Sequence, residues 1–145
     1  MTSKDDTMID GIRFQAALEG IDASCLQGFF VEWPNPPSAQ KHLEILSASH
    51  GIELAIDETT GHVVGFINVI SDGCYSSYIP LLEVLPGYQG RGIARELIRR
   101  IVARYSGFYM LDLCCNKEIV PVYASHGFLE VSGMAHRNFD RQSGE

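Results

Sequence analysis

The sequence is most constrained over residues 78–104, where a strand, a glycine-rich turn and a basic helix follow one another directly. The stretch YIPLLEVLP (78–86) has the apolar character of a strand, and GYQGRG (87–92) places three glycines within six residues. Apolar residues then recur at helical spacing, namely Ile93, Ala94, Leu97, Ile98, Ile101 and Val102. A strand that leads directly into such a helix predicts a sheet covered by helices.

The three glycines need an explanation beyond a turn, which needs only one. Without Cβ atoms the backbone lets a phosphate approach closely, and the first N–H groups of a helix have no intrahelical partner. The stretch is therefore typical of an anion-binding turn, and a plain strand-to-helix turn is the alternative. Two familiar phosphate motifs are absent, because the sequence has no GxxxxGK[ST] string and GxGxxG fails at Arg95.

The remaining pattern predicts further strands and helices around this unit. We expect strands at 11–18, 52–57, 63–70, 108–113 and from 127 to 131, and helices at 22–30, 38–50 and 117–126. Asp22 and Ser38 are suited to cap the first two helices. Strands that first meander and then cross over through a helix indicate an α/β (α+β) fold, and 145 residues fit one domain, residues 1–145.

Charge and composition exclude several functional classes. The net charge of −7 argues against binding to nucleic acid or to an anionic membrane, and the longest apolar run, residues 63–70, is too short to span a bilayer. The first ten residues lack a signal-peptide pattern, so we expect a cytoplasmic protein. The four cysteines, Cys25, Cys74, Cys114 and Cys115, show no CxxC spacing and are expected to be reduced, buried thiols. The five histidines show no metal-ligand spacing, so no metal is expected.

Two motifs together resemble the GCN5-related N-acetyltransferase (GNAT) family. LEVLPGYQGRGIARELI (82–98) is similar to its V-x-P-x-x-[QR]-x-x-G-x-[GA] motif, with Val84, Pro86, Gln89, Gly92 and Ala94 in place. Downstream, LDLCCNKEIVPVYASHGF (111–128) resembles the second family signature, with Asn116, Tyr123 and a closing Gly127–Phe128 pair. The resemblance covers residues 52–131 well, whereas the first fifty residues match only in the order of their elements.

The resemblance implies a mixed, mostly antiparallel sheet flanked by helices, with a splayed pair of parallel strands that binds acetyl-CoA. Strand pairing should fail near Pro86, which has no N–H to donate. The pantetheine arm would then pair with the backbone of Leu82, Glu83 and Val84. The pyrophosphate would be bound by main-chain N–H groups of Gln89, Gly90, Arg91, Gly92, Ile93 and Ala94, with the Arg91 and Arg95 side chains available to the phosphates. A solvated helix face is an equally good interpretation of Arg99 and Arg100.

The resemblance also implies a reaction in which an amine attacks the thioester directly. Tyr123 occupies the position that donates a proton to the CoA sulfur in many family members, and a packed aromatic side chain is the alternative. Asn116 would contact the cofactor arm, and it can also serve as a helix N-cap.

The general base is the least determined part of the site. The family's usual base positions hold Pro80 and Tyr78, of which proline cannot act and tyrosine is a poor base at neutral pH. Glu83, Asp112 or a chain of water molecules are the substitutes, and we favour Glu83. An arginine partner would explain either carboxylate equally well.

The acceptor is expected beside FFVEWPNPPS (29–38), where family members build that pocket. Phe30 and Trp33 would wall it, Glu32 would attract an ammonium group, and Tyr78 is placed among the acceptor-binding residues; ordinary packing is an alternative for Phe30. The resulting hypothesis is an acetyl-CoA-dependent N-acetyltransferase that acts on a primary amine of a small molecule or a protein, without a metal and as a homodimer. A non-catalytic acyl-CoA sensor is the alternative, and a plain nucleotide-binding module is disfavoured.

Overall fold

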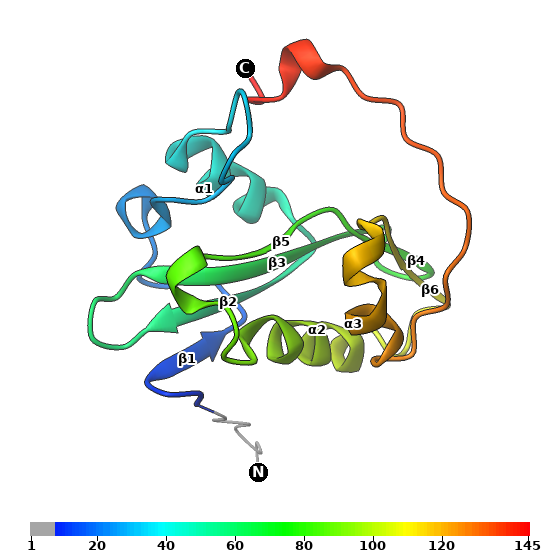
Figure 1. Cartoon of the computed structure of the whole chain (residues 1–145), viewed down its shortest axis with the longest axis horizontal. Coiled ribbons are helices and arrows are strands. Elements are labelled where there is room, and N and C mark those ends of the chain that lie inside the picture. The colour runs from blue at the N-terminus through cyan, green and yellow to red at the C-terminus, as the bar shows by residue number, and fades with distance from the viewer. Residues whose placement is uncertain (1–7) are drawn as a thin grey trace.

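The computed structural model describes residues 8–145 and is built around one six-stranded sheet (Figure 1). The strands are β1 (Ile12–Gln15), β2 (Gly51–Asp57), β3 (Val63–Ser71), β4 (Ser76–Ile79), β5 (Leu82–Val84) and β6 (Met110–Leu113). Their order is β1-β2-β3-β4-β6, and β5 pairs with β3 in line with β4. All of these pairs are antiparallel except β4–β6, which is parallel. The predicted mixed, mostly antiparallel sheet is confirmed.

Helices cover both faces of the sheet. The helix α1 (Ala39–Ala48) lies on one face and α2 (Ile93–Arg104) on the other, as Figure 1 shows, and α3 (Val120–Ala124) adds Val122 and Tyr123 to the core on the α2 side. Short 3₁₀ turns occur at Ala23–Leu26, Pro86–Tyr88, Lys117–Ile119 and Phe139–Arg141. The predicted caps are confirmed, because Asp22 accepts a hydrogen bond from the Ser24 N–H and Ser38 accepts one from the Lys41 N–H.

The helix α2 packs closely on β3 because Gly65 has no side chain. A Cβ atom at Gly65 would lie 3.2 Å from Ile93 and 3.3 Å from Val84. Ile93, Leu97, Ile98 and Ile101 are buried here, as their helical spacing predicted. This contact fixes the start of α2 beside the end of β5.

The single strand expected at 78–86 is two short strands, because the chain is interrupted at Pro80 and Leu81. The Leu81 N–H bonds to the Asn68 side chain at 3.1 Å instead of continuing a regular ladder. The register on β3 shifts there by one residue: Tyr78 lies opposite Ile70, whereas Glu83 lies opposite Phe66. Since Phe66 and Ile70 are four residues apart on one strand, Tyr78 and Glu83 face the same side of the sheet.

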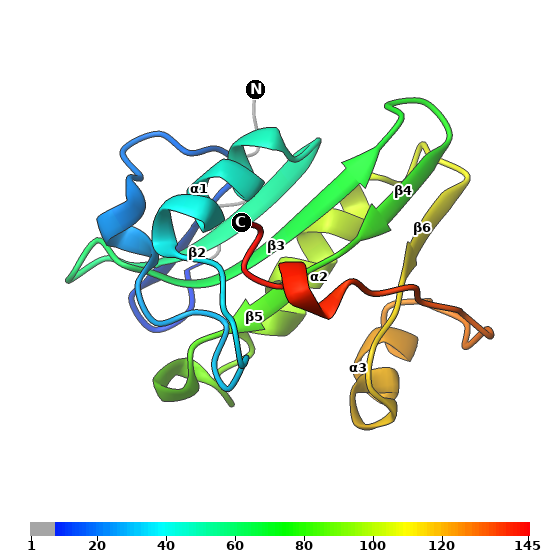
Figure 2. The ribbon, with the colours of Figure 1, turned by 90° about the horizontal axis from the view of Figure 1, so that it is seen from above.

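Two expected elements are wrong. Residues 22–30 contain only the 3₁₀ turn Ala23–Leu26, and residues 127–131 are not a strand. Instead, residues 129–138 form an extended segment that arcs from α3 towards the α1 side of the molecule (Figures 1 and 2). Leu129 and Met134 are 86% and 100% exposed in it. Its far end is held where the Asn35 N–H donates to the Gln142 side chain at 2.8 Å.

Two further expectations from the sequence concern the burial of the cysteines and the presence of membrane-spanning segments. All four cysteines are free thiols, but only Cys25 is even half-buried, so the expectation of buried thiols is wrong for Cys74, Cys114 and Cys115. They lie in or beside turns and strand ends, where the chain leaves the core. Among residues 8–145, no helix has the length and apolar character needed to cross a membrane.

Candidate functional site

The glycine-rich turn forms an open cradle at the start of α2. Gly92 is the N-cap of α2 with φ of 84°, and Gly90 has φ of 78°, a region that residues with a side chain rarely adopt. Nothing lies within 4 Å of the position that a Cβ atom would take at either glycine. The backbone N–H groups at this helix end are therefore accessible to a ligand, and the helix dipole favours an anion there.

A cavity of about 190 Å³ opens directly on this cradle. It is lined by Val84, Tyr88, Gln89, Gly90, Gly92, Ile93, Ala94, Arg95 and Val122. All of these except Tyr88 and Val122 are cofactor-binding residues predicted from the sequence, so the structure brings this part of the predicted set together. Leu82, Glu83, Arg91, Asn116 and Tyr123 are not part of its lining.

The two residues that the sequence analysis missed have identifiable roles. Tyr88 is fixed by its hydroxyl, which donates to the Asp57 side chain at 2.7 Å and thereby ties the turn to the end of β2. Val122 comes from α3, more than 25 residues after the turn. An aromatic residue inside the glycine-rich stretch was a usable signal for Tyr88, whereas no local signal pointed to Val122.

The outer edge of β5, away from β3, pairs with no other strand among residues 8–145, because β6 pairs with β4 and not with β5. The space beside this edge, beyond the end of the β4–β6 pair, is called the gap below. Leu81 and Leu85 make backbone hydrogen bonds to β3, where the Leu81 C=O accepts from the Asn68 N–H and the Leu85 N–H donates to the Val64 C=O. Because hydrogen-bonding directions alternate along a strand, the peptide groups of Leu82 and Val84 point away from β3. The Val84 C=O accepts from the Gln89 side-chain amide at 3.0 Å. The predicted pantetheine-binding backbone is thus directed into the gap.

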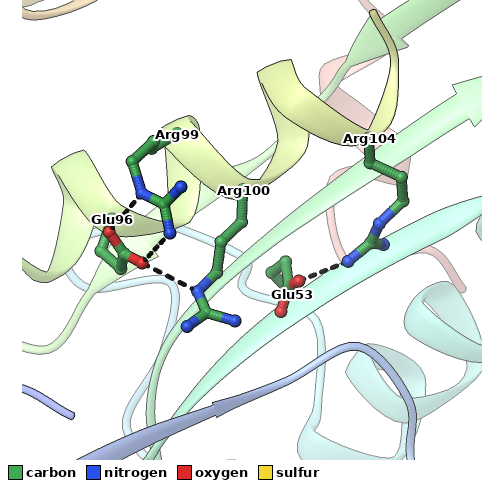
Figure 3. A network of polar contacts seen from close by, with 5 residues as sticks. All are labelled: Glu53, Glu96, Arg99, Arg100 and Arg104. Carbon is green, nitrogen blue, oxygen red and sulfur yellow. Dashed lines mark hydrogen bonds and ion pairs between the residues drawn. The ribbon is translucent and has the colours of Figure 1, made fainter. Parts of the chain in front are cut away.

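The four arginines from Arg91 to Arg100, in and just before α2, divide into two groups. Arg91 lies over the Tyr88 ring at 5.1 Å, and Arg95 is exposed, with its guanidinium 3.4 Å from the Ser125 hydroxyl. Both lie at the cradle end of the helix. Further along, Arg99 and Arg100 both bind Glu96, and their charges lower the pKa of that carboxyl group, with the Arg99 hydrogen bond contributing most (Figure 3).

A second ion pair joins the end of α2 to the sheet. Arg104 binds Glu53 of β2, and both residues are shown in Figure 3. Glu53 is almost completely buried, and this burial raises the pKa of its carboxyl group despite the nearby Arg104 and Arg100 charges. The pair anchors α2 on β2 and lies outside the residues that line the cavity.

Tyr123 is buried among apolar groups on the α2 side of the sheet. Its side chain is 6% exposed and its ring meets that of Phe128 edge to face at 5.5 Å. Burial, with a smaller contribution from Cys115, raises the pKa of the Tyr123 hydroxyl to about 12. Asn116 is the N-cap of the 3₁₀ turn Lys117–Ile119, but its side chain makes no capping hydrogen bond.

The two candidate carboxylates differ in their surroundings. Both oxygens of Glu83 accept from the Phe30 N–H, at 2.9 and 3.0 Å, and one also accepts from the Val31 N–H at 3.3 Å. Asp112 is exposed on β6 and lies opposite Tyr78 in the parallel register. Partners in a parallel ladder project to the same face, so Tyr78, Asp112 and Glu83 all face the α1 side.

The acceptor-side loop is held in an unusual backbone conformation. Phe30 and Glu32 have φ of 62° and 67°, which is uncommon for residues other than glycine. The bonds to Glu83 fix this conformation. Phe30 is buried, whereas Trp33 is 38% exposed and its ring lies 4.9 Å from that of Phe30. Glu32 is exposed, and Tyr78 is half-exposed with the pKa of its hydroxyl raised, first of all by its contact with Cys114.

Comparisons with known proteins agree with this geometry. Residues 18–128, more than half of the chain, match the model of the acetyltransferase (GNAT) family. A structure of a candidate acetyltransferase from Deinococcus radiodurans R1 is 38% identical, with a TM-score of 0.89 over 94% of this chain and 95% of that one. A GNAT-family acetyltransferase from Streptococcus pneumoniae TIGR4 is 28% identical, with a TM-score of 0.70 over 88% of this chain and 98% of that one.

More distant structures share the fold alone. Glucosamine-6-phosphate N-acetyltransferase from Arabidopsis thaliana is 16% identical, with a TM-score of 0.66 over 89% of this chain and 99% of that one. A sequence comparison with curated proteins gives no significant match.

Proposed function

The chain belongs to the acetyltransferase (GNAT) family, and from that premise we propose that it transfers an acetyl group from acetyl-CoA to a primary amine of a small molecule or a protein. The observation that carries the proposal is the cavity at the start of α2. It joins the open glycine backbone, the outer edge of β5 and the Arg95 side chain in one place. Each of these matches a part of acetyl-CoA.

The residues at the cavity fit the co-substrate. The N–H groups around Gly90 and Gly92 would bind the pyrophosphate, where the missing side chains leave room for it. Arg91 and Arg95 would add positive charge at the cradle end of α2. The peptide groups of Leu82 and Val84 would pair with the pantetheine arm, and Asn116, whose side chain makes no capping bond, would contact that arm from the β6 side.

In the proposed reaction a neutral amine attacks the thioester carbonyl carbon. The C–N bond forms, the C–S bond breaks, and the departing thiolate takes a proton. We assign that proton to the Tyr123 hydroxyl, whose raised pKa keeps it protonated at neutral pH. Water that protonates the thiolate, with Tyr123 as a packed side chain, is the alternative.

The base that accepts the amine's proton is assigned to Glu83, with Asp112 or water as the alternatives. Glu83 is supported by its place on the strand that borders the gap, and by its facing the acceptor side together with Tyr78. Asp112 is supported by its exposure and by its place opposite Tyr78. Phe30, Glu32, Trp33 and Tyr78 are proposed to surround the acceptor.

We also propose that the chain is one domain that works in the cytoplasm, without a metal, and as a homodimer. One sheet that includes strands from Ile12 to Leu113 and carries a core on each face supports the single domain. Free thiols at all four cysteines are compatible with a reducing compartment.

The experiment that tests the function is the release of CoA thiol from acetyl-CoA in the presence of a panel of amines, together with calorimetry of acetyl-CoA binding. We expect binding, and thiol release that depends on the amine. Binding without release for any amine would instead support the acyl-CoA sensor. Absence of binding would contradict both.

A further inference from the structure

The core covers only part of the α1-side face of the sheet. On that side, the cluster of buried side chains comes from α1, the residues before it, β2 and β3, and among residues 8–145 it includes none from β4 or β6. Tyr78 of β4 and Asp112 of β6 lie opposite each other, face this side and are both exposed. The surface in front of these two strands is therefore open to a ligand.

The segment 129–138 spans this open surface. Near its middle it lies against the end of β6, because a Cβ atom at Gly133 would lie 3.3 Å from the sulfur of Cys114, which directly follows β6. Beyond the segment, the Asn35 N–H of the acceptor-side loop donates to the Gln142 side chain at 2.8 Å. Figure 2 looks onto the α1 side and shows the segment passing in front of β6 towards β5. The segment thus connects the exposed strands with the acceptor-side loop.

This segment also lies outside the part of the chain that the family model matches, which ends at residue 128. Segments outside the shared core of a fold are where its members differ in the ligands that they bind. A segment in this position is therefore suited to determine which acceptor this chain uses.

Arg137 is the cation that the segment brings to the open surface. Its side chain is exposed and forms no ion pair with any of residues 8–145. The pKa of the Tyr78 hydroxyl is raised, first of all by its contact with Cys114, and the Arg137 charge opposes this rise, which agrees with a place on the same side of the sheet. A guanidinium group binds a carboxylate or a phosphate through two parallel N–H groups.

The groups around this surface carry charges of both signs. Glu32 on the acceptor-side loop and Asp112 on β6 are exposed carboxylates, which attract the ammonium form of an amine. These carboxylates would serve any amine. The Arg137 guanidinium contributes to binding only when the acceptor also has a negative charge, so the pattern favours an acceptor with both charges.

From this arrangement we propose that the segment 129–138 forms the outer wall of the acceptor site, and that Arg137 binds an anionic group of the acceptor. The acceptor is then an amine that also carries a carboxylate or a phosphate. Glu32 and Asp112 attract its ammonium group, and Arg137 fixes its other end. The proposal rests on the acetyltransferase function, because it names the substrate class of that reaction.

The first test measures the preference for an anionic amine in the native protein and in Arg137→Gln. Thiol release from acetyl-CoA is followed with β-alanine and ethylamine, and with O-phosphoethanolamine and ethanolamine, and the preference is the ratio of kcat/KM within each pair. We expect the native protein to prefer one of the two anionic amines, and Arg137→Gln to reduce that preference by about tenfold or more. Because the same amines are used with both proteins, their intrinsic reactivities cancel.

Arg141→Gln is the matched control, because it removes the same charge from an exposed arginine just beyond the segment. We expect this variant to keep the native preference. The pair that shows the larger preference identifies the anion as carboxylate or phosphate. No preference in the native protein, an unchanged preference in Arg137→Gln, or an equal fall in Arg141→Gln overturns the proposal and leaves the acetyltransferase function intact. Absence of thiol release with every amine overturns the function and this substrate class together.

The second test locates the segment without using activity. Gly133→Cys places a thiol beside Cys114, at a separation within reach of a disulfide bond. Under mild oxidation we expect peptide mass spectrometry to find the bond between residues 133 and 114. Met134→Cys is the control, because Met134 is 100% exposed and should form this bond much more slowly. Failure of the Gly133 variant to form the bond, or equal rates in both variants, overturns the placement of the wall.

Discussion

Tyr123 combines almost complete burial with a hydroxyl that stays protonated far above neutral pH. The unfolded chain ionises a tyrosine near pH 10, whereas the folded protein does so near 12. Between these two values the unfolded state releases a proton that the folded state keeps, so this residue's contribution to stability is present below pH 10 and is lost as the pH rises towards 12. The raised pKa keeps the hydroxyl protonated at neutral pH, but it also makes the hydroxyl a weaker acid towards the thiolate.

Replacing Tyr123 with phenylalanine separates the two roles. We expect acetyl-CoA affinity to stay near the native value while turnover falls by about tenfold or more, because only the proton donor is removed. Denaturant unfolding should also show that the free energy of unfolding falls less between pH 10 and pH 12 in this variant than in the native protein. Native turnover with a good acceptor would show that Tyr123 only packs and that water protonates the thiolate.

Glu83 and Asp112 form a matched pair for the base. If Glu83 accepts the proton of the acceptor ammonium, Glu83→Gln should flatten the acidic limb of the rate–pH profile, and Asp112→Asn should not. Glu83 also accepts hydrogen bonds from the N–H groups of Phe30 and Val31, so Glu83→Gln should raise the KM of the acceptor as well.

The pH profile distinguishes these roles from each other. A raised KM with an unchanged profile would make Glu83 a residue that positions the acceptor loop. A profile changed only by Asp112→Asn would assign the base to Asp112. A profile changed by neither variant would leave water as the base.

At the scale of helices and strands, the sequence pattern predicted the features that depend on contacts between residues close together in the chain. The spacing of the apolar residues predicted the helix 93–104, and the three glycines predicted the open backbone of the cradle. The break at Pro80 was visible as a proline, but the register shift beside it was not, because it depends on the Asn68 side chain of another strand. Strict alternation along one strand would put Glu83 and Tyr78 on opposite faces, and the register shift brings them to the same face.

The prediction of a strand at 127–131 was wrong because it, too, depends on a distant part of the chain. GFLEV has the apolar alternation of a strand, but a strand exists only when another strand accepts its hydrogen bonds. Among residues 8–145 none pairs with it.

The cradle itself is tested by placing a side chain in it. Gly92→Glu introduces bulk and negative charge where the pyrophosphate is proposed to bind, and its φ of 84° also disfavours any side chain. We expect calorimetry to show loss of acetyl-CoA binding. Gly61→Glu is the control, because Gly61 is an equally open glycine with φ of 74° in the turn between β2 and β3. Native affinity in the Gly92 variant would contradict the assignment of residues 89–94.

At the scale of the whole molecule, the segment 129–138 is the part least integrated into the fold. Limited proteolysis should therefore cut residues 8–145 first within 129–141, at Arg137 or Arg141 with trypsin and near Leu129 or Met134 with chymotrypsin. Mass spectrometry of the early fragments measures this. Acetyl-CoA should protect the exposed Arg91 in the cradle without protecting Arg137. If the early cuts are instead spread evenly over the sheet and residues 129–138 resist cleavage, the segment 129–138 is paired with a strand in solution.

The parallel pairing of β4 with β6 also sets the order in which the chain can become functional. The β2–β3 hairpin closes over a turn of a few residues, whereas β6 can reach β4 only after α2 has formed and crossed the sheet. Contacts between distant parts of a chain cost more loop entropy and form more slowly than local ones. During refolding, most of the sheet should therefore assemble before β6 completes the gap beside the outer edge of β5. Competence to bind acetyl-CoA then becomes the last property that the refolding chain acquires.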